Sequence, residues 1–219
     1  MAVPEVYVLG GYQTDFARNW TKESKHFSAL MREGVLGALQ ECEIAPEEVE
    51  SAHVGNFAAE LYCMQGHLGA FFTEIDPAFS GLPTSRHEAA CASGSVAILA
   101  ATAEIEAGRY DLACVVGIEQ MRNVPGKTAA QHLGSAAWTG HEFGDAEFVW
   151  PRAFSDLAAE YDRRHGLNPA HLRRIAEINF ANAKRNPNAQ TRGYSFSPES
   201  FTDDDAANPV VEGRVRKMD

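Results

Sequence analysis

The stretch that decides the fold spans residues 86–117 and reads RHEAACASGSVAILAATAEIEAGRYDLACVVG. Residues 86–90 are expected to enter a β-sheet. The small and apolar residues at 92–107 predict a tightly packed helix, and Gly108 suits the left-handed position that follows many helices. Residues 111–117 form a continuous apolar run, which is typical of a strand covered on both faces. Strand, helix and strand in this order predict an α/β fold.

Three upstream segments extend the α/β pattern. Residues 6–9, Val-Tyr-Val-Leu, are β-branched, aromatic or aliphatic and stop at two glycines, which predicts a first, buried strand. Apolar residues recur at three- and four-residue steps between His26 and Cys42, which predicts a helix that faces the core. Residues 52–57 then predict a second strand.

The character of the sequence changes after Glu119. Glycine, proline, tryptophan, histidine and acidic residues alternate without a sustained period until about residue 153, which predicts loops. We therefore place a domain boundary near Ile118 and expect domains at 1–118 and 119–219. Helices are predicted over 155–165 and 169–185, the second capped by Asn168 with Pro169 in its first position.

Composition narrows the possible classes of function. The 19 Lys and Arg residues against 30 Asp and Glu residues give a net charge of −11, so a nucleic-acid backbone would be repelled. Neither a secretory signal pattern nor an apolar run of membrane-spanning length is present, which predicts no membrane segment. The four cysteines lie far apart without a Cys-x-x-Cys pair, which favours free thiols and a reducing cytoplasm.

Cys91 stands at the junction between the predicted strand and the helix over 92–107. The first N–H groups of a helix lack intrahelical partners and carry partial positive charge, so they lower the pKa of a nearby thiol. The same groups can stabilise the oxyanion that forms when an acyl carbonyl is attacked. Cys91 is therefore predicted to be a nucleophile whose own N–H is an oxyanion donor. The alternative is a small buried side chain, which is the usual role of a free cysteine.

A metal site is disfavoured by the same segment. The residues His87-Glu88-Ala89-Ala90-Cys91 partly match the His-Glu-x-x-His pattern of zinc peptidases, but a cysteine replaces the second histidine. The segment is also predicted to begin as a strand, so the two ligands would not share a helical face. No metal ligands are assigned, and the histidines at 53, 132, 141 and 165 are interpreted as surface or structural residues.

The segment Ala89-Ala90-Cys91-Ala92-Ser93-Gly94-Ser95, together with residues 100–111 and 115–121, resembles the nucleophile helix and following strand of thiolases. It is most similar to sterol-carrier-type thiolases and acetyl-CoA acetyltransferases. Residues 8–16, 54–56, 158–188 and 208–219 resemble other parts of the family's N-terminal half. The resemblance implies a layered αβαβα thiolase fold, here the N-terminal mixed-sheet half and the loop domain.

Membership of this family implies acyl transfer in two steps. Cys91 would carry the acyl group as a thioester during thiolysis of a 3-ketoacyl-CoA or Claisen condensation of acyl-CoA. Coenzyme A is then a substrate, and no cofactor is bound permanently. Trp150, Arg152 and Phe154, just before the predicted helix over 155–165, would lie near the pantetheine arm, although ordinary packing also explains them. A homodimer or larger assembly is expected.

Several thiolase motifs do not occur in these residues. They are Asn-Glu-Ala-Phe, Gly-His-Pro, whose histidine activates the cysteine, and the Cys-x-Gly motif with a second cysteine. In the family they belong to a second half of similar fold, which we expect in the same chain or in a separate one. Residues 1–219 alone are expected to be inactive. The alternatives are a thiolase-like retro-aldol lyase acting on a CoA thioester and a non-catalytic scaffold subunit.

Overall fold

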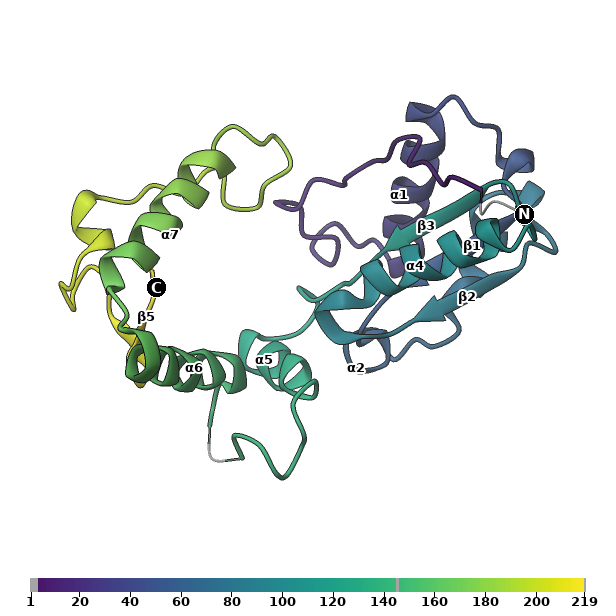
Figure 1. Cartoon of the computed structure of the whole chain (residues 1–219). Coiled ribbons are helices and arrows are strands. Elements are labelled where there is room, and N and C mark those ends of the chain that lie inside the picture. The colour runs from purple at the N-terminus through teal and green to yellow at the C-terminus, as the bar shows by residue number, and fades with distance from the viewer. Residues whose placement is uncertain (1–3, 145, 219) are drawn as a thin grey trace. The chain divides into compact units, whose positions relative to one another are not determined.

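The computed structural model describes residues 4–144 and 146–218. The chain divides into two compact units, one made of the residues up to Thr14 with Asn19–Pro125, the other of Asp15–Arg18 with the residues from Gly126 onward. The first unit contains α1 (Phe27–Glu41), η1 (Pro46–Glu48), β1 (Ser51–Gly55), α2 (Ala59–Cys63), η2 (Leu68–Phe71), α3 (Phe72–Ile75), η3 (Pro77–Phe79), β2 (Thr84–His87), η4 (Ala90–Ala92), α4 (Ser93–Glu106) and β3 (Ala113–Gly117) (Figure 1).

The three strands of the first unit form a parallel sheet in the order β2-β1-β3. Gly55 of β1 is paired with His87 of β2 and with Gly117 of β3, so all three strands end at the same edge. The α/β class is confirmed, and the central strand and the strand before Gly117 occur where the sequence predicts them. Among the described residues this sheet has no antiparallel strand, although a mixed sheet was expected.

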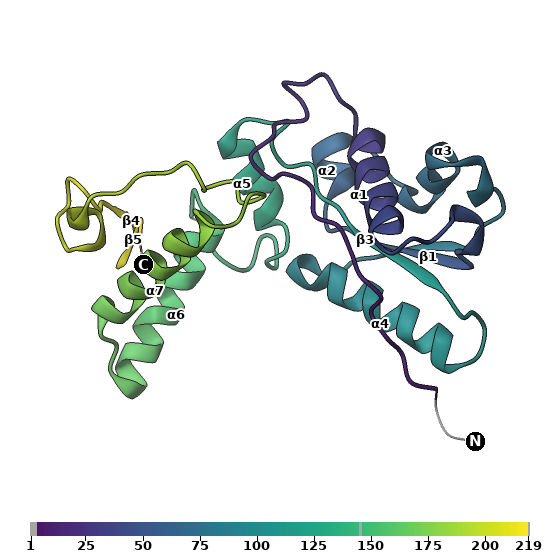
Figure 2. The same cartoon turned by 90° about the horizontal axis from the view of Figure 1, so that it is seen from above.

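A hydrophobic core fills one face of the sheet. Helix α1 presents a buried stripe at steps of four residues, as its sequence predicts, and α2 and α3 lie on the same side (Figure 2). Ala52 and Val54 of β1 point into this core because alternate residues of a strand face opposite sides. The largest fully buried apolar side chains here are Phe27, Met31, Val35, Leu68, Phe72 and Phe79.

Helix α4 covers the opposite face of the sheet (Figure 2). Its buried residues are small, namely Ser93, Ala97 and Ala101. Gly55 lies so close to the first turn of the helix that a Cβ atom there would be 2.7 Å from the Cα of Gly94. Small residues on both elements therefore allow the backbone of α4 to lie directly on β1.

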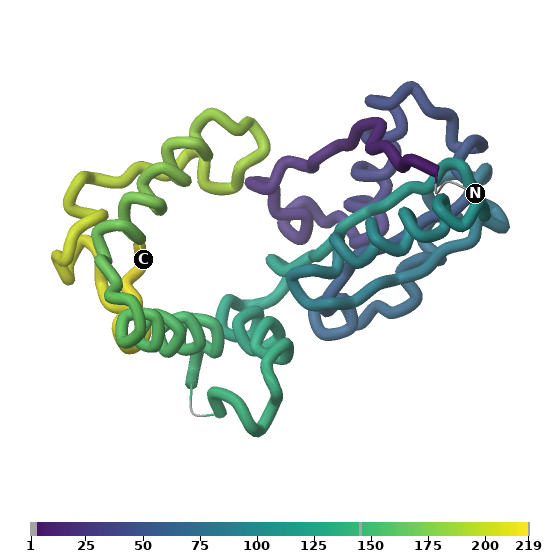
Figure 3. Tube along the Cα trace, in the orientation of Figure 1, coloured from purple at the N-terminus to yellow at the C-terminus, as the bar shows by residue number. Residues whose placement is uncertain are grey.

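Two predictions about strands are wrong. Residues 6–9 form no strand but an irregular segment (Figure 3), in which Tyr7, Val8 and Leu9 are 70%, 89% and 64% exposed. Strand propensity alone does not suffice, because a strand is stabilised by its partner strand and by burial. Strand β3 is not covered on both faces either, since Cys114 is buried whereas Val115 is 36% exposed.

The second unit contains α5 (Gly126–Gly134), α6 (Val149–His165), α7 (Pro169–Ala183), η5 (Pro198–Phe201) and the antiparallel hairpin of β4 (Val210–Glu212) and β5 (Val215–Arg216). The prediction of α7 is confirmed, since the Asn168 side chain accepts from the Ala170 N–H at 3.0 Å and Pro169 is the first helical residue. The region predicted as loop, however, contains α5 and the beginning of α6, which starts at Val149 rather than at residue 155.

Polar contacts hold the second unit together. Gly213 makes the hairpin turn at φ 52° and lies against Ser155 of α6, whose Oγ accepts from the Arg214 N–H at 3.0 Å. Arg192 binds Asp15 through two hydrogen bonds of 2.7 and 2.9 Å, which lowers the pKa of that carboxyl group. No helix among the described residues is both long enough and apolar enough to span a bilayer.

The contact between Gly55 and Gly94 gives a first prediction. Gly55→Ala should destabilise the first unit by about 1–3 kcal/mol, because the new methyl group would meet helix backbone, which cannot rotate away. Urea unfolding followed by the fluorescence of the buried Trp20 measures this loss. Gly94→Ala is the matched control, since a Cβ there meets nothing within 4 Å. Equal stabilities of the two variants would contradict the close packing of α4 on β1.

Candidate active site

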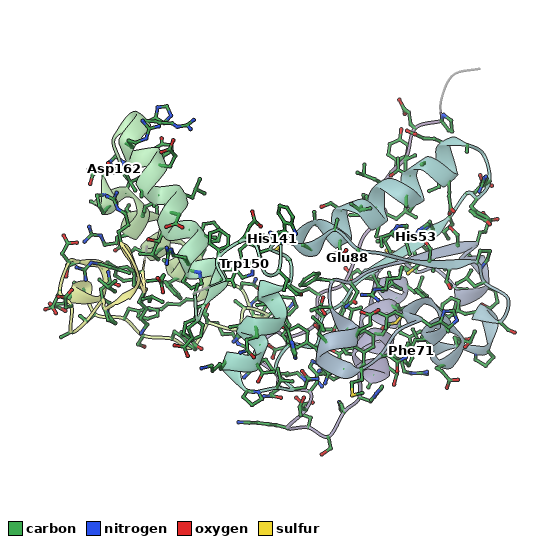
Figure 4. All side chains as sticks on the ribbon, turned by 90° about the horizontal axis from the view of Figure 1, so that it is seen from below. His53, Phe71, Glu88, His141, Trp150 and Asp162 are labelled. Atoms are coloured by element: carbon green, nitrogen blue, oxygen red, sulfur yellow. The ribbon has the colours of Figure 1, made fainter. Side chains whose placement is uncertain are left out.

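Cys91 lies in a tight turn between β2 and α4. The strand ends at His87, the chain passes through the 3-10 turn η4, and α4 begins at Ser93. Figure 4 shows Glu88 at the beginning of α4, three residues before the cysteine. The position of Cys91 between strand and helix is as the sequence predicts, but residues 88–90 have already left the sheet. The thiol is exposed, which excludes the interpretation of Cys91 as a buried packing residue.

The residue before the thiol has an unusual backbone conformation. Ala90 has φ 49°, in the left-handed region that costs a residue with a side chain about 1–2 kcal/mol. The Glu88 carboxylate accepts a hydrogen bond from the Ala90 N–H at 2.6 Å. This charged acceptor helps to offset the cost of the turn and thereby fixes the direction in which Cys91 leaves the sheet.

Ser93 secures the same turn from the other side. Its hydroxyl accepts from the Ala89 N–H at 2.9 Å and donates to the Ala90 carbonyl at 2.7 Å. A third bond, from the Ala92 N–H to the Ala89 carbonyl at 2.9 Å, closes the turn. Ser93 itself is only 5% exposed, so these bonds form away from competing water. The backbone just before Cys91 is therefore held by one buried hydroxyl.

The other three cysteines are less suited to nucleophilic attack. Cys114 is buried, which raises its pKa to about 11, and Cys63 is half-buried with a pKa raised by burial and by the nearby Glu119 carboxylate. A thiol with a raised pKa is less often the reactive thiolate at neutral pH. Cys42 is also partly covered, so Cys91 is the exposed one of the four.

A partly buried carboxylate organises the edge of the sheet at which all three strands end. Glu119 follows β3 and accepts hydrogen bonds from the Phe57 N–H at 2.8 Å and from the Asn56 side chain at 3.0 Å. Burial raises the pKa of Glu119, and these hydrogen bonds oppose that rise. Asn56 also donates to the Ile118 carbonyl at 2.7 Å, so the ends of β1 and β3 are tied together. Glu119 is not among the site residues predicted from the sequence, although an acidic residue directly after an apolar strand is a recognisable signal.

Trp150, Arg152 and Phe154 lie within α6 and not before it. Trp150 donates its ring N–H to the Leu133 carbonyl of α5 at 3.0 Å, and Phe154, four residues later on the same face, is 60% exposed. Arg152 lies on the opposite face and pairs with Asp156 at 3.2 Å. The three side chains therefore do not form one cluster. They belong to the second unit, whereas Cys91 belongs to the first.

Within residues 4–144 and 146–218, no three His, Cys, Asp or Glu side chains are arranged to hold a metal ion. Of the histidines interpreted as surface or structural residues, His53 is structural. It is 3% exposed and contacts Glu104 and His87 under α4.

Comparison with known proteins adds to this geometry. The family model described as the thiolase N-terminal domain matches residues 6–191, a range that includes the turn at Cys91 and both flanking elements. The chain belongs to the thiolase family. The match also agrees with the α/β architecture, in which the strand before Cys91 and the helix after it belong to one parallel-sheet unit.

Several thiolase relatives are similar over most of this chain. It is 30% identical over 186 residues to an acetyl-CoA acetyltransferase of Methanocaldococcus jannaschii, covering 85% of this chain and 46% of the relative. It is 27% identical over 187 residues to an acetyl-CoA acetyltransferase of Methanothermobacter thermautotrophicus, covering 85% and 47%. Sterol carrier protein 2 of Gallus gallus is 26% identical over 196 residues, covering 84% and 34%. The chain thus spans about half the length of these relatives, or less.

Ser93→Ala tests the turn at Cys91. The substitution leaves the Ala89 N–H and the Ala90 carbonyl without their partner in a buried place, which should cost about 1–3 kcal/mol. The Ala90 turn should relax, so the rate of Cys91 alkylation by iodoacetamide should change. Peptide mass spectrometry measures that rate, and Ser95→Ala, at an exposed position of the same helix, is the control. Unchanged stability and alkylation in Ser93→Ala would show that the hydroxyl does not hold the turn.

Proposed function

We propose that the protein is a thiolase-type acyl-CoA acyltransferase in which Cys91 carries the acyl group. The observation that supports this most strongly is an exposed thiol in a strained turn at the first residues of α4. Two relatives named acetyl-CoA acetyltransferase support the same reaction class. Coenzyme A thioesters are the proposed substrates, and no permanently bound cofactor is required.

The proposed reaction has two steps. The Cys91 thiolate attacks the 3-keto carbonyl of a 3-ketoacyl-CoA, and the resulting oxyanion accepts a hydrogen bond from the Cys91 N–H. The bond between C2 and C3 then breaks, acetyl-CoA leaves as its enolate and takes up a proton, and the acyl group remains on sulfur. The thiol of coenzyme A attacks this thioester, acyl-CoA leaves, and the Cys91 thiolate is restored. Condensation is the reverse sequence, and the covalent intermediate divides one difficult step into two easier ones.

A second thiolase half, in the same chain or in a separate one, is proposed to complete the site. Helix α4 is rich in small and apolar residues, and its outward residues Ile98 and Leu99 are 52% and 66% exposed. Helices of this kind normally lie between two covered faces. The proposed half would cover this face and supply the base that activates Cys91. Trp150, Arg152 and Phe154 are proposed to approach the pantetheine arm.

A cytoplasmic homodimer or larger assembly is proposed as the working form. All four cysteines are free thiols, which supports a reducing compartment. The net charge of −11 gives no support to a nucleic-acid partner.

The covalent intermediate is directly testable. Brief exposure to acetyl-CoA, with the C-terminal half present, should add one acetyl group to Cys91, because the thioester precedes the second step. Peptide mass spectrometry identifies the modified residue. Cys91→Ala should abolish both the adduct and turnover, whereas Cys63→Ala should retain both. Turnover by Cys91→Ala would contradict the proposal and favour retro-aldol cleavage without an acyl-enzyme, and a folded complex with neither adduct nor turnover would favour a scaffold subunit.

The proposed contact with a second half gives a separate test. Leu99→Lys should leave the fold of the first unit intact, since the side chain is exposed, but should weaken binding of the C-terminal half at least tenfold, because a lysine charge would be desolvated. Gln40→Lys adds the same charge at an exposed position of α1, on the other side of the sheet, and should bind normally. Binding is measured by titration calorimetry or co-purification. Equal binding by both variants would contradict the assignment of this face.

A further inference from the structure

A partly buried polar cluster, with His53 as its buried member, lies between the sheet and α4, outside the turn at Cys91. His53 of β1 and His87 of β2 stack with ring centroids 5.2 Å apart, and His53 Nδ1 is 2.9 Å from His87 Nε2. Ser85 Oγ lies 3.1 Å from His53 Nδ1 and 2.8 Å from His87 Nε2. Glu104 of α4 completes the cluster, with Oε2 at 3.0 Å from His53 Nε2. Figure 4 shows His53 beneath α4, away from Glu88.

The hydrogen bonds determine which ring nitrogen of His53 carries the proton when the histidines of the cluster are neutral. The Glu104 carboxylate only accepts, so His53 Nε2 must carry a proton and donate it. In a neutral imidazole the other nitrogen is then an acceptor, so His53 Nδ1 accepts from Ser85 or from His87 Nε2. Every close contact can be satisfied in this state.

The cluster can bind one additional proton and keep its hydrogen bonds, but a second additional proton creates charge repulsion. If His53 is charged, its Nδ1–H can donate to Ser85 Oγ or to the lone pair of His87 Nε2, and Glu104 balances the charge. If His87 is charged as well, two N–H groups face each other at 2.9 Å and two positive rings stack at 5.2 Å. Like charges at this separation in a buried place repel strongly.

We propose that His53, Ser85, His87 and Glu104 form a proton-sensitive clasp, which holds α4 on the sheet with at most one added proton and releases it when a second proton binds. The clasp joins three elements, because its members come from β1, β2 and α4. It would operate whatever reaction Cys91 performs. Since α4 begins two residues after Cys91, release of the helix would also free the turn that carries the thiol.

The charged groups around the clasp agree with this proton count. The pKa of His87 is lowered by burial and by His53, and only Glu104 opposes the shift. Strand β3 also packs on α4, but its one titratable side chain, Cys114, belongs to the core on the α1 side of the sheet. Arg86 pairs with Glu60 instead, and alternation along β2 directs it to the opposite face from His87.

The sign of the pH effect follows from linkage. A histidine whose pKa is lowered on folding binds more protons in the unfolded chain, so its contribution to stability is present above the unfolded value of about 6.5 and is lost as the pH falls. A proton that binds only to the opened state increases the equilibrium constant for opening of α4 by at most about 25-fold between pH 7 and pH 5, for an unfolded pKa of about 6.5.

Amide hydrogen exchange in α4, with intrinsic exchange rates divided out at each pH, measures this opening in the intact protein. His87→Gln removes the second proton, so the increase in opening from pH 7 to pH 5 should be smaller than in the wild type, by at most about 25-fold. Glu104→Gln keeps a hydrogen-bond acceptor for His53 but removes the negative charge beside it, so the increase should be larger than in the wild type. His67→Asn changes an exposed histidine of the same unit and should match the wild type.

The two variants shift the pH response in opposite directions, which a merely structural role would not do. The proposal is overturned if His87→Gln, folded by near-ultraviolet circular dichroism at pH 7.5, keeps the wild-type pH response. It is equally overturned if Glu104→Gln weakens that response. If His87→Gln does not fold, the isosteric Glu104→Gln decides alone.

Discussion

The close approach of Gly55 to Gly94 is the constraint on which the rest of the first unit depends. Because Gly55 has no side chain at this contact, the backbone of α4 lies directly on the central strand, with the helix beginning at the edge where all three strands end. That position determines where the chain must turn after β2. The turn is short, and it contains Cys91. The packing of α4 on β1 thus determines where the thiol of Cys91 lies and that it is exposed.

The short turn carries a conformational cost, and local hydrogen bonds offset it. Ala90 adopts a left-handed backbone that a residue with a side chain rarely adopts, and Glu88 and Ser93 bind the backbone groups on either side of it. The exposed thiol of Cys91 therefore follows a strained segment that is held by neighbouring side chains. Glu119 likewise holds the ends of β1 and β3 together, because its partly buried carboxylate accepts hydrogen bonds from backbone N–H groups.

The two faces of the sheet differ in chemistry. The face beneath α1 is apolar and closely filled, whereas the face beneath α4 contains small residues and the His53, Ser85, His87 and Glu104 cluster. A buried polar cluster is stable only when its hydrogen bonds are satisfied, so the attachment of α4 depends on protonation as well as on packing. The outward face of the same helix exposes large apolar side chains, which is unusual for a helix with one face in contact with solvent.

The sequence by itself determined the α/β class, the helices α1, α4 and α7, and the junction that carries Cys91, because each has a local signal: apolar period, small residues, or a cap such as Asn168. Only the tertiary structure decided the rest. Residues 6–9 have strand propensity but no strand partner, and α5 has only 9 residues, too few for a sustained period. His53 resembles any strand histidine until β2 and α4 bring His87 and Glu104 to it. The left-handed Ala90 follows from where α4 is seated, and contacts between distant residues have no local pattern in the chain.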